Sequence, residues 1–264
     1  MSQTPAPTMG RPGDIINWPM LKISYETDPE CIAKLLPPGV EPGKNPTVKI
    51  IIYNFPVLNE PEYGVVVNVA ADVDGVEGEY TLGIGIDQEA AIAGSKERWG
   101  QPKFFAETKY YRIFDEVKAS VTHQGYTFLE FSGKVKGPVE VTEDLQDFEV
   151  NEWWVKYSRA VDMMPYKFDF PPHVVQVYSR YGTAYMEEVE GTLKLNESPW
   201  DPVAQLLPVK SEPKAFLWTP TFKARNISLN KPLDPKGFWP FADTIGSSMW
   251  PGENGAPSKK LFKK

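Results

Sequence analysis

The chain has 264 residues and a formal net charge of −7, so it is long enough for a single domain with a sizeable core. This acidic balance argues against nucleic acid or an anionic membrane surface as a partner, because both bind basic faces. A single cysteine excludes an intramolecular disulfide, and we recognise neither a signal peptide nor a membrane span, so we expect a cytoplasmic protein.

The first third of the chain predicts a short helix among strands. Residues 1–14 are typical of a flexible arm, and Asp28 followed by Pro29 predicts the start of a helix that ends before the prolines at 37 and 38. Alternating or β-branched runs, separated by Gly, Asp and Pro, predict strands at residues 20–25, 47–55, 64–73 and 79–86.

Residues 87–108 predict a helix followed by an extended segment. Asp87 is a good N-cap, the run after it is rich in alanine, and Gly100 with Pro102 is a stop signal. Lys103 therefore follows a helix end and has aromatic neighbours. Burial among them would favour the neutral amine, which is the nucleophile of carbonyl chemistry. The alternative is a surface lysine whose amine reaches water.

The second half predicts more antiparallel strands. We expect a meander at 105–114, 116–123 and 126–135, a strand at 148–157 with Trp153 and Trp154 on opposite faces, and a hairpin of 174–180 with 183–193. A short helix at 201–207 and a strand at 214–229 follow, and apolar segments at 238–241 and 249–251 cover either a barrel mouth or, as we favour, a subunit interface. These elements predict one mainly antiparallel β domain at 15–250, with a few short helices packed outside, and a polar tail at 251–264.

Several blocks carry a family resemblance. The helix motif 94–97, which ends in Glu97, leads after four residues to Pro102 and Lys103, and segments 21–38, 78–80 and 198–209 match in the same order. This pattern resembles the acetoacetate decarboxylase family. The resemblance implies a cone-shaped closed β-barrel, a Schiff base on Lys103, a catalytic role for Glu97, no added cofactor and a homo-oligomer.

The chain departs from the family pattern near the lysine. The second lysine of the family pair is Phe104 here, so burial rather than a neighbouring cation would have to lower the amine's pKa. The family's arginine aligns with Trp18 and its glutamate with Gly64 or Val65, so we expect neither charge. We expect a substrate bulkier or less charged than acetoacetate, bound by Trp18, Met20, Tyr63, Phe104 and Tyr111.

Other site types find no support in the sequence. The two histidines, His123 and His173, lie far apart, and no His or Cys cluster has metal-ligand spacing, so we expect no metal site. Gly83 and Gly85 lie inside an apolar strand rather than at a helix start, and neither a Walker loop nor a serine nucleophile elbow occurs.

Three functional hypotheses remain. The first is a carbon–carbon lyase that decarboxylates a β-keto acid through an iminium on Lys103. The second is an aldolase or dehydratase that acts on a 2-oxo acid through the same lysine. The third is a barrel that binds a small apolar ligand without catalysis. The nucleophilicity of Lys103 near neutral pH distinguishes the first two from the third.

Overall fold

The computed structural model describes residues 19–57, 60–162, 164–253 and 256–257. The predicted N-terminal arm, Trp18 and much of the predicted C-terminal tail lie outside the described residues. In the part that is described, no helix combines the length and the apolar character that crossing a membrane requires.

Most of the molecule is one twelve-stranded sheet, which confirms the predicted mainly β fold. Its hydrogen-bonded order is β10-β5-β4-β3-β1-β12-β11-β9-β8-β7, with β2 on β4 and β6 on β5. Strand β10 pairs with both β5 and β11. The hydrogen-bonded path that leads from β10 through β5 to β11 therefore comes back to β10. The strands are β1 (Met20–Glu26), β2 (Glu41–Pro42), β3 (Thr47–Val57), β4 (Glu60–Val73), β5 (Val76–Ile86), β6 (Lys103–Phe105), β7 (Glu107–Ile113), β8 (Glu116–His123), β9 (Tyr126–Pro138), β10 (Phe148–Arg159), β11 (Phe168–Leu195) and β12 (Lys214–Pro232).

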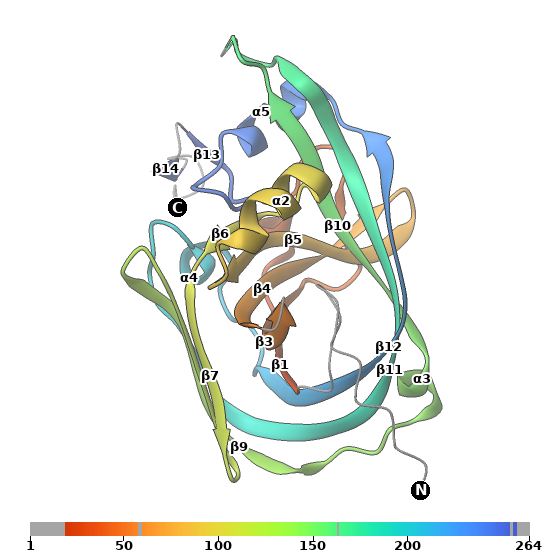
Figure 1. Cartoon of the computed structure of the whole chain (residues 1–264), viewed down its shortest axis with the longest axis vertical. Helices are drawn as coiled ribbons and strands as arrows, with labels where there is room; N and C mark the ends of the chain where they lie inside the picture. The colour runs from red at the N-terminus through yellow and green to blue at the C-terminus, as the bar shows by residue number, and fades with distance from the viewer. Residues whose placement is uncertain (1–18, 58–59, 163, 254–255, 258–264) are drawn as a thin grey trace, which may run out of the picture.

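The helices are short. They are α1 (Pro29–Ala33), α2 (Ala90–Trp99), α3 (Glu143–Gln146), α4 (Val203–Leu206) and α5 (Pro235–Ala242), and a small second sheet joins β13 (Gly252–Glu253) to β14 (Ala256–Pro257). In Figure 1 the long strands β11 and β12 run together along one side of the molecule, and β7 and β9 form the opposite side. The helix α2 lies beside β6 and β10.

The predicted hairpin in the second half is wrong, because β11 is a single strand from Phe168 to Leu195. It pairs with β12 along most of its length, while β10 covers its first part and β9 its last part. Register shifts on either side of Gly182, between Arg180 and Tyr181 and between Thr183 and Tyr185, let the strand bend there without reversing direction.

Two further local expectations are corrected by tertiary contacts. Asp87 is not the N-cap of α2, since Glu89 takes that position and the Asp87 carboxylate accepts the backbone N–H of Tyr63 at 2.8 Å. The apolar segments after β12 do not present Phe238, Phe241, Met249 or Trp250 to a mouth or a subunit interface, whereas Trp239 is only partly buried. Phe238 and Trp250 are instead fully buried in the chain's own core.

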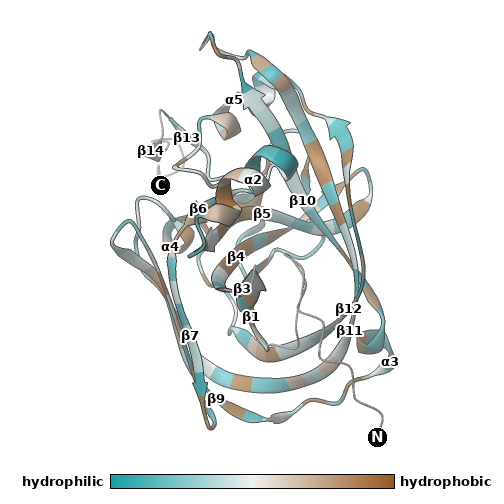
Figure 2. Ribbon diagram, viewed as in Figure 1, coloured by the Kyte–Doolittle hydropathy of each residue, from teal (hydrophilic) through white to brown (hydrophobic). Residues whose placement is uncertain are grey.

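The sheet separates two apolar faces. Trp153 belongs to the main core, whereas Trp154 packs in a separate cluster with Val175 and Val177, which confirms that the two side chains lie on opposite faces. Figure 2 shows the corresponding alternation of hydrophobic and hydrophilic residues along β11. The candidate site lies on the Trp154 face.

Candidate active site

A cavity of about 780 Å³ lies between α2 and the strands β1, β3, β4, β5, β10 and β12. Met20, Tyr53, Glu62 and Lys103 are among the residues that line it. Its volume is in the upper part of the range of roughly 300–1,000 Å³ that is typical of pockets for drug-sized ligands.

The end of α2 positions Lys103. Gly100 takes the left-handed conformation with φ of 72°, and its N–H bonds to the carbonyl of Lys96, which ends the helix as predicted. The chain then enters β6, where Lys103 pairs with Ile84 of β5 in parallel. Successive side chains of a strand point to opposite faces, so Lys103 lines the cavity while Phe104 turns away and stacks on His123 at 4.4 Å between ring centroids.

A buried carboxylate accompanies the lysine. The Nζ atom of Lys103 lies 4.0 Å from Oε2 of Glu62, and the two side chains are only 11% and 4% exposed. The hydroxyl of Tyr53 donates to Oε1 of Glu62 at 3.2 Å, whereas Oε2 is buried without a hydrogen-bond partner. One carboxylate oxygen is therefore held in place and the other faces the amine.

Gly64 makes room for this arrangement. It lies two residues after Glu62 on the same face of β4 and pairs with Tyr53 of β3. A Cβ at Gly64 would come within 2.5 Å of the Tyr53 ring and hydroxyl. The tyrosine therefore needs a glycine here to lie over β4 and reach Glu62.

Burial shifts both ionisable groups toward their neutral forms. It lowers the pKa of the Lys103 ammonium below its usual value, and the nearby charge of Glu62 partly opposes that effect. Burial also raises the pKa of the Glu62 carboxyl, against the effects of Lys103 and of the Tyr53 hydrogen bond. The pair can thus supply both a neutral amine and a carboxyl group able to exchange a proton with it.

The structure brings only some of the residues predicted from the sequence to this cavity. Met20 and Lys103 line it, whereas Phe104 packs into the core behind the site. The other three described candidates are not among the lining residues: Glu97 is exposed on α2, Tyr63 is half-buried against the core, and Tyr111 is 48% exposed on β7.

Glu62 was not identified as a site residue from the sequence. We expected no carboxylate here because the aligned positions are Gly64 and Val65, and that expectation is wrong since Glu62 occupies the place beside the lysine. The alternation of side chains along a strand could have indicated it, because Glu62 lies two residues before the aligned Gly64 and on the same face of β4. Lys22, Glu79 and Glu152 also line the cavity and were not singled out from the sequence.

Replacement of Glu62 by glutamine is expected to make Lys103 reactive at lower pH. The Glu62 charge favours the protonated ammonium, so its removal lowers the pKa of Lys103 further and populates the free amine at lower pH. Acetylation of Lys103 by acetic anhydride, followed by peptide mass spectrometry across pH, measures this midpoint. Glu107→Gln, at an exposed residue of β7, is the control; a midpoint that is unmoved or higher in Glu62→Gln contradicts the coupling.

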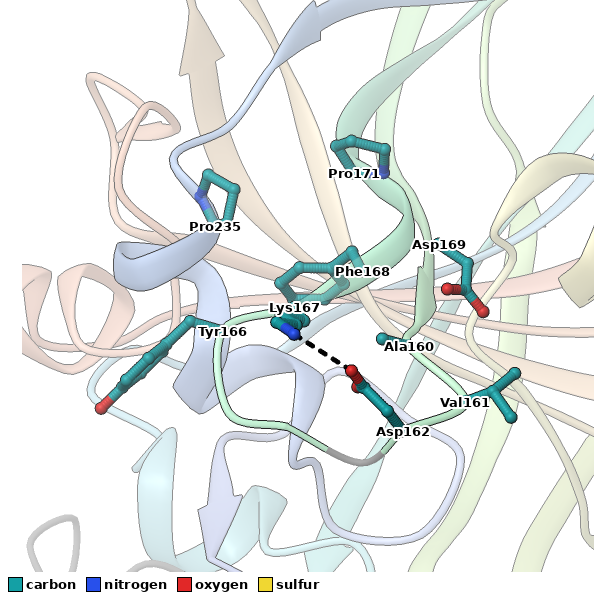
Figure 3. A pocket seen from close by; sticks show the side chains of 9 residues that line it. All are labelled: Ala160, Val161, Asp162, Tyr166, Lys167, Phe168, Asp169, Pro171 and Pro235. Carbon is teal, nitrogen blue, oxygen red and sulfur yellow. Dashed lines mark hydrogen bonds and ion pairs between the residues drawn. The ribbon is translucent and has the colours of Figure 1, made fainter.

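A second cavity, of about 570 Å³, lies at the loop between β10 and β11. Figure 3 shows Lys167 turned toward Asp162 at its edge, where their ion pair measures 3.1 Å. The charged side chains of its lining are exposed, so they lack the desolvation that perturbs Lys103. Among the described residues, no three His, Cys, Asp or Glu side chains are grouped as a metal site.

A protein-family model matches most of the chain. The model of the family described as acetoacetate decarboxylase matches residues 1–230. Acetoacetate decarboxylase 1 of Bradyrhizobium diazoefficiens is 36% identical over 107 residues, which cover 39% of this chain and 41% of that protein. A segment of 110 residues is 36% identical to the acetoacetate decarboxylase of Paraburkholderia phytofirmans, with the same two coverages. The chain thus spans about two fifths of the length of these curated relatives.

Solved structures match over more of the chain. The acetoacetate decarboxylase of Legionella pneumophila superposes with a TM-score of 0.67 at 20% identity and covers 86% of this chain and 92% of its own. The enduracididine biosynthesis enzyme MppR in complex with pyruvate gives 0.61 at 14% identity, over 79% of this chain and 87% of its own. At these identities the likeness shows the fold.

Proposed function

The chain belongs to the acetoacetate decarboxylase family, and on this premise we propose that it is a lyase that forms a Schiff base between Lys103 and a β-keto acid and releases carbon dioxide. The observation that supports this proposal best is the buried Lys103 amine, 4.0 Å from a carboxylate and facing a large cavity. A desolvated lysine is the nucleophile that this chemistry requires, as is known for acetoacetate decarboxylase itself.

The proposed reaction proceeds in four steps. The neutral amine of Lys103 adds to the substrate ketone, and loss of water leaves a protonated imine. The electron pair of the bond to the carboxylate then moves into this imine, which releases carbon dioxide and leaves an enamine. A proton added to the enamine carbon regenerates the iminium, and water hydrolyses it to the product ketone and the free amine. No external oxidant, reductant or cofactor is needed for this balance.

Glu62 is the residue placed to move protons in these steps. Its Oε2 atom faces Lys103, and its raised pKa lets it hold a proton that the departing water or the enamine carbon requires. Tyr53 acts as a positioning residue because its hydroxyl fixes the other carboxylate oxygen. In this scheme burial supplies what a second lysine supplies elsewhere in the family, since Phe104 points away from the site.

An aldolase or dehydratase acting on a 2-oxo acid is the second candidate. One structural neighbour, MppR, was solved with pyruvate and with the condensation product of pyruvate and imidazole 4-carboxaldehyde. The same Lys103 iminium could lose a proton instead of carbon dioxide, and the resulting enamine would add to an aldehyde. The apolar part of the cavity beside Lys103 leaves room for such a second reactant.

Borohydride trapping tests the proposal. Acetoacetate, pyruvate and an aryl β-keto acid are offered separately, the mixture is reduced, and the intact mass and the modified peptide are measured. We expect one adduct on Lys103, and the adduct mass of a β-keto acid shows whether carbon dioxide has left. An adduct from pyruvate alone favours the aldolase candidate, and no adduct from any of the three favours a non-catalytic ligand-binding barrel.

A further inference from the structure

The cavity extends well beyond the reactive lysine. Along β4, Glu62 pairs with Phe55 of β3, and Asn68 pairs with Lys49. Glu62 and Asn68 are six positions apart, which corresponds to about 20 Å of strand at roughly 3.3 Å per residue. The lysine end and the Lys49 end of the cavity therefore lie at different heights of the same strands.

The far end holds two carboxylates that already have partners. Lys49 donates to Glu79 at 2.5 Å, and the side-chain amide of Asn68 donates to Glu79 at 2.7 Å and to Glu152 at 3.5 Å. Glu152 lies on β10 and pairs with Glu79 of β5. Glu79 therefore has a direct cationic partner, whereas the contact of Glu152 is to a neutral amide. The charges of Arg225 and Lys22 act on Glu152 from a longer distance.

Two cations at the same end have no carboxylate oxygen within 4.0 Å among the described residues. The ammonium of Lys22 lies over the Trp218 ring, 3.7 Å from its centroid. Arg225 donates to the hydroxyls of Ser179 at 3.1 Å and Tyr181 at 2.6 Å, both of which are uncharged. Tyr181 packs edge-on against Trp218 at 5.5 Å, so the two cations flank one aromatic cluster.

Desolvation makes the charged form of Lys22 unfavourable in the cavity. Burial lowers the pKa of Lys22 to about 8, and the charges of Glu79 and Glu152 partly oppose that effect. The ammonium is therefore mostly protonated at neutral pH, although no carboxylate oxygen of the described residues lies within 4.0 Å. A partly buried charge without a direct ion pair is destabilising, and an anion that binds beside it recovers part of that free energy. Arg225 is more exposed and gives this end of the cavity a second, permanently charged donor.

The wall between the two ends is mainly apolar. Met20, Ile51, Val66 and Ile84 line it. Lys22 pairs with Ile51, which in turn pairs with Val66, four positions beyond Glu62 on β4, so the backbone level of Lys22 lies about 13 Å from that of Glu62. A keto acid as small as acetoacetate would leave most of this 780 Å³ space without contacts.

We infer that the substrate is an elongated carbonyl compound whose carbonyl reaches Lys103, whose middle part is apolar, and whose distal anionic group is bound by Lys22 and Arg225. The inference rests on the proposed function for the carbonyl end only. The apolar contacts and the two cations define a subsite separate from the groups that carry out the reaction.

Three ketones test this subsite in the borohydride experiment. They are 9-oxodecanoate, which carries a distal carboxylate; its methyl ester, which is neutral and of similar length; and levulinate, which is short. At equal low concentration we expect wild-type protein to trap 9-oxodecanoate at least about tenfold more than the ester, since a charge-assisted hydrogen bond commonly contributes that much or more. Peptide mapping must place each adduct on Lys103.

Variants identify the residues responsible. Lys22→Met keeps the length of the side chain and is expected to bring the ratio between acid and ester close to one. Arg225→Gln is expected to lower the ratio as well, and it serves independently if Lys22→Met does not fold. Lys118→Met, at an exposed residue of β8 outside the cavity, is the matched control and should keep the wild-type ratio.

The outcomes separate this inference from the proposed function. A ratio near one in wild-type protein, with adducts on Lys103 from all three ketones, overturns the distal subsite and leaves the Schiff base standing. A high ratio that survives both Lys22→Met and Arg225→Gln overturns the assignment of these residues. No adduct from any ketone removes the Schiff base, and with it the carbonyl end on which the inference rests.

Discussion

Replacement of Lys103 by methionine is expected to reduce carbon dioxide release from a substrate β-keto acid to the uncatalysed rate. Methionine retains the apolar stem of lysine but has no amine to form the iminium. Enzymes commonly accelerate their reactions by about 10⁶-fold or more, and without the electron sink nearly all of this acceleration should disappear. The measurement is carbon dioxide release at saturating substrate, and Lys103→Ala should give the same result.

Two controls keep this result interpretable. Lys109→Met changes a lysine on β7 whose side chain is 68% exposed and forms an ion pair with Glu107. This variant should release carbon dioxide as wild-type protein does. Thermal unfolding of Lys103→Met shows whether the domain is intact, because the side chain packs in the cavity wall rather than in the core. Undiminished release by a folded Lys103→Met variant would remove this lysine from the mechanism.

Replacement of Gly100 by alanine is expected to destabilise the domain by about 3 kcal/mol or more. The residue has φ of 72°, a conformation that costs a non-glycine residue roughly 1–3 kcal/mol. In addition, a Cβ there would come within 2.5 Å of both the Lys156 Cα and the Val155 carbonyl oxygen. These are backbone atoms of β10, so the clash cannot be relieved by turning a side chain and must displace either the strand or the end of α2.

Gly94→Ala is the matched control in the same helix. It lies in the interior of α2, and no atom would lie within 4 Å of its Cβ. Alanine favours a helix interior over glycine by about 0.5–1 kcal/mol, so this variant should be slightly more stable than wild-type protein. Urea unfolding measures both changes; equal unfolding midpoints for the two variants would contradict the close approach of Gly100 to β10.

Local patterns were enough to predict much of the fold. The strands β1, β3, β5, β8 and β12 were predicted within a few residues, because short alternating or β-branched runs ended at Gly, Pro or Asp turns. The helix α2 and its end at Gly100 were also predicted, since Gly with a nearby Pro is a strong local stop. The family assignment made from the motif before Lys103 is confirmed by the match over residues 1–230. A homo-oligomer and a cytoplasmic location stay predictions.

Errors arose where distant strands decide the outcome. Whether the chain reverses at Gly182 depends on which strands lie beside β11, and pairing with β12 on both sides of Gly182 keeps β11 a single, bent strand. Asp87 has good capping chemistry, but the neighbouring N–H of Tyr63 is a competing donor that only the approach of β4 provides. The four aromatic residues at 238–241 and 249–251 look exposed in a tail. In the folded chain, Phe238, Phe241 and Trp250 are buried in the main core and Trp239 packs against it.

The sequence alone was enough to predict a mainly β member of its family with Lys103 just after a helix end, because these properties reside in contiguous residues. The groups that surround that lysine could be identified only from the packing of strands that are distant in the chain. A residue reaches the cavity only if its strand has the right register, and a slip of one position would turn it to the other face. The pairing of β3 with β4 brought Glu62 under Tyr53, and the bulge between Val67 and Asn68 set the register beyond it. Lys22 and Arg225 face one cavity because β1, β12 and β11 are neighbours in the sheet, although their positions along the chain are far apart.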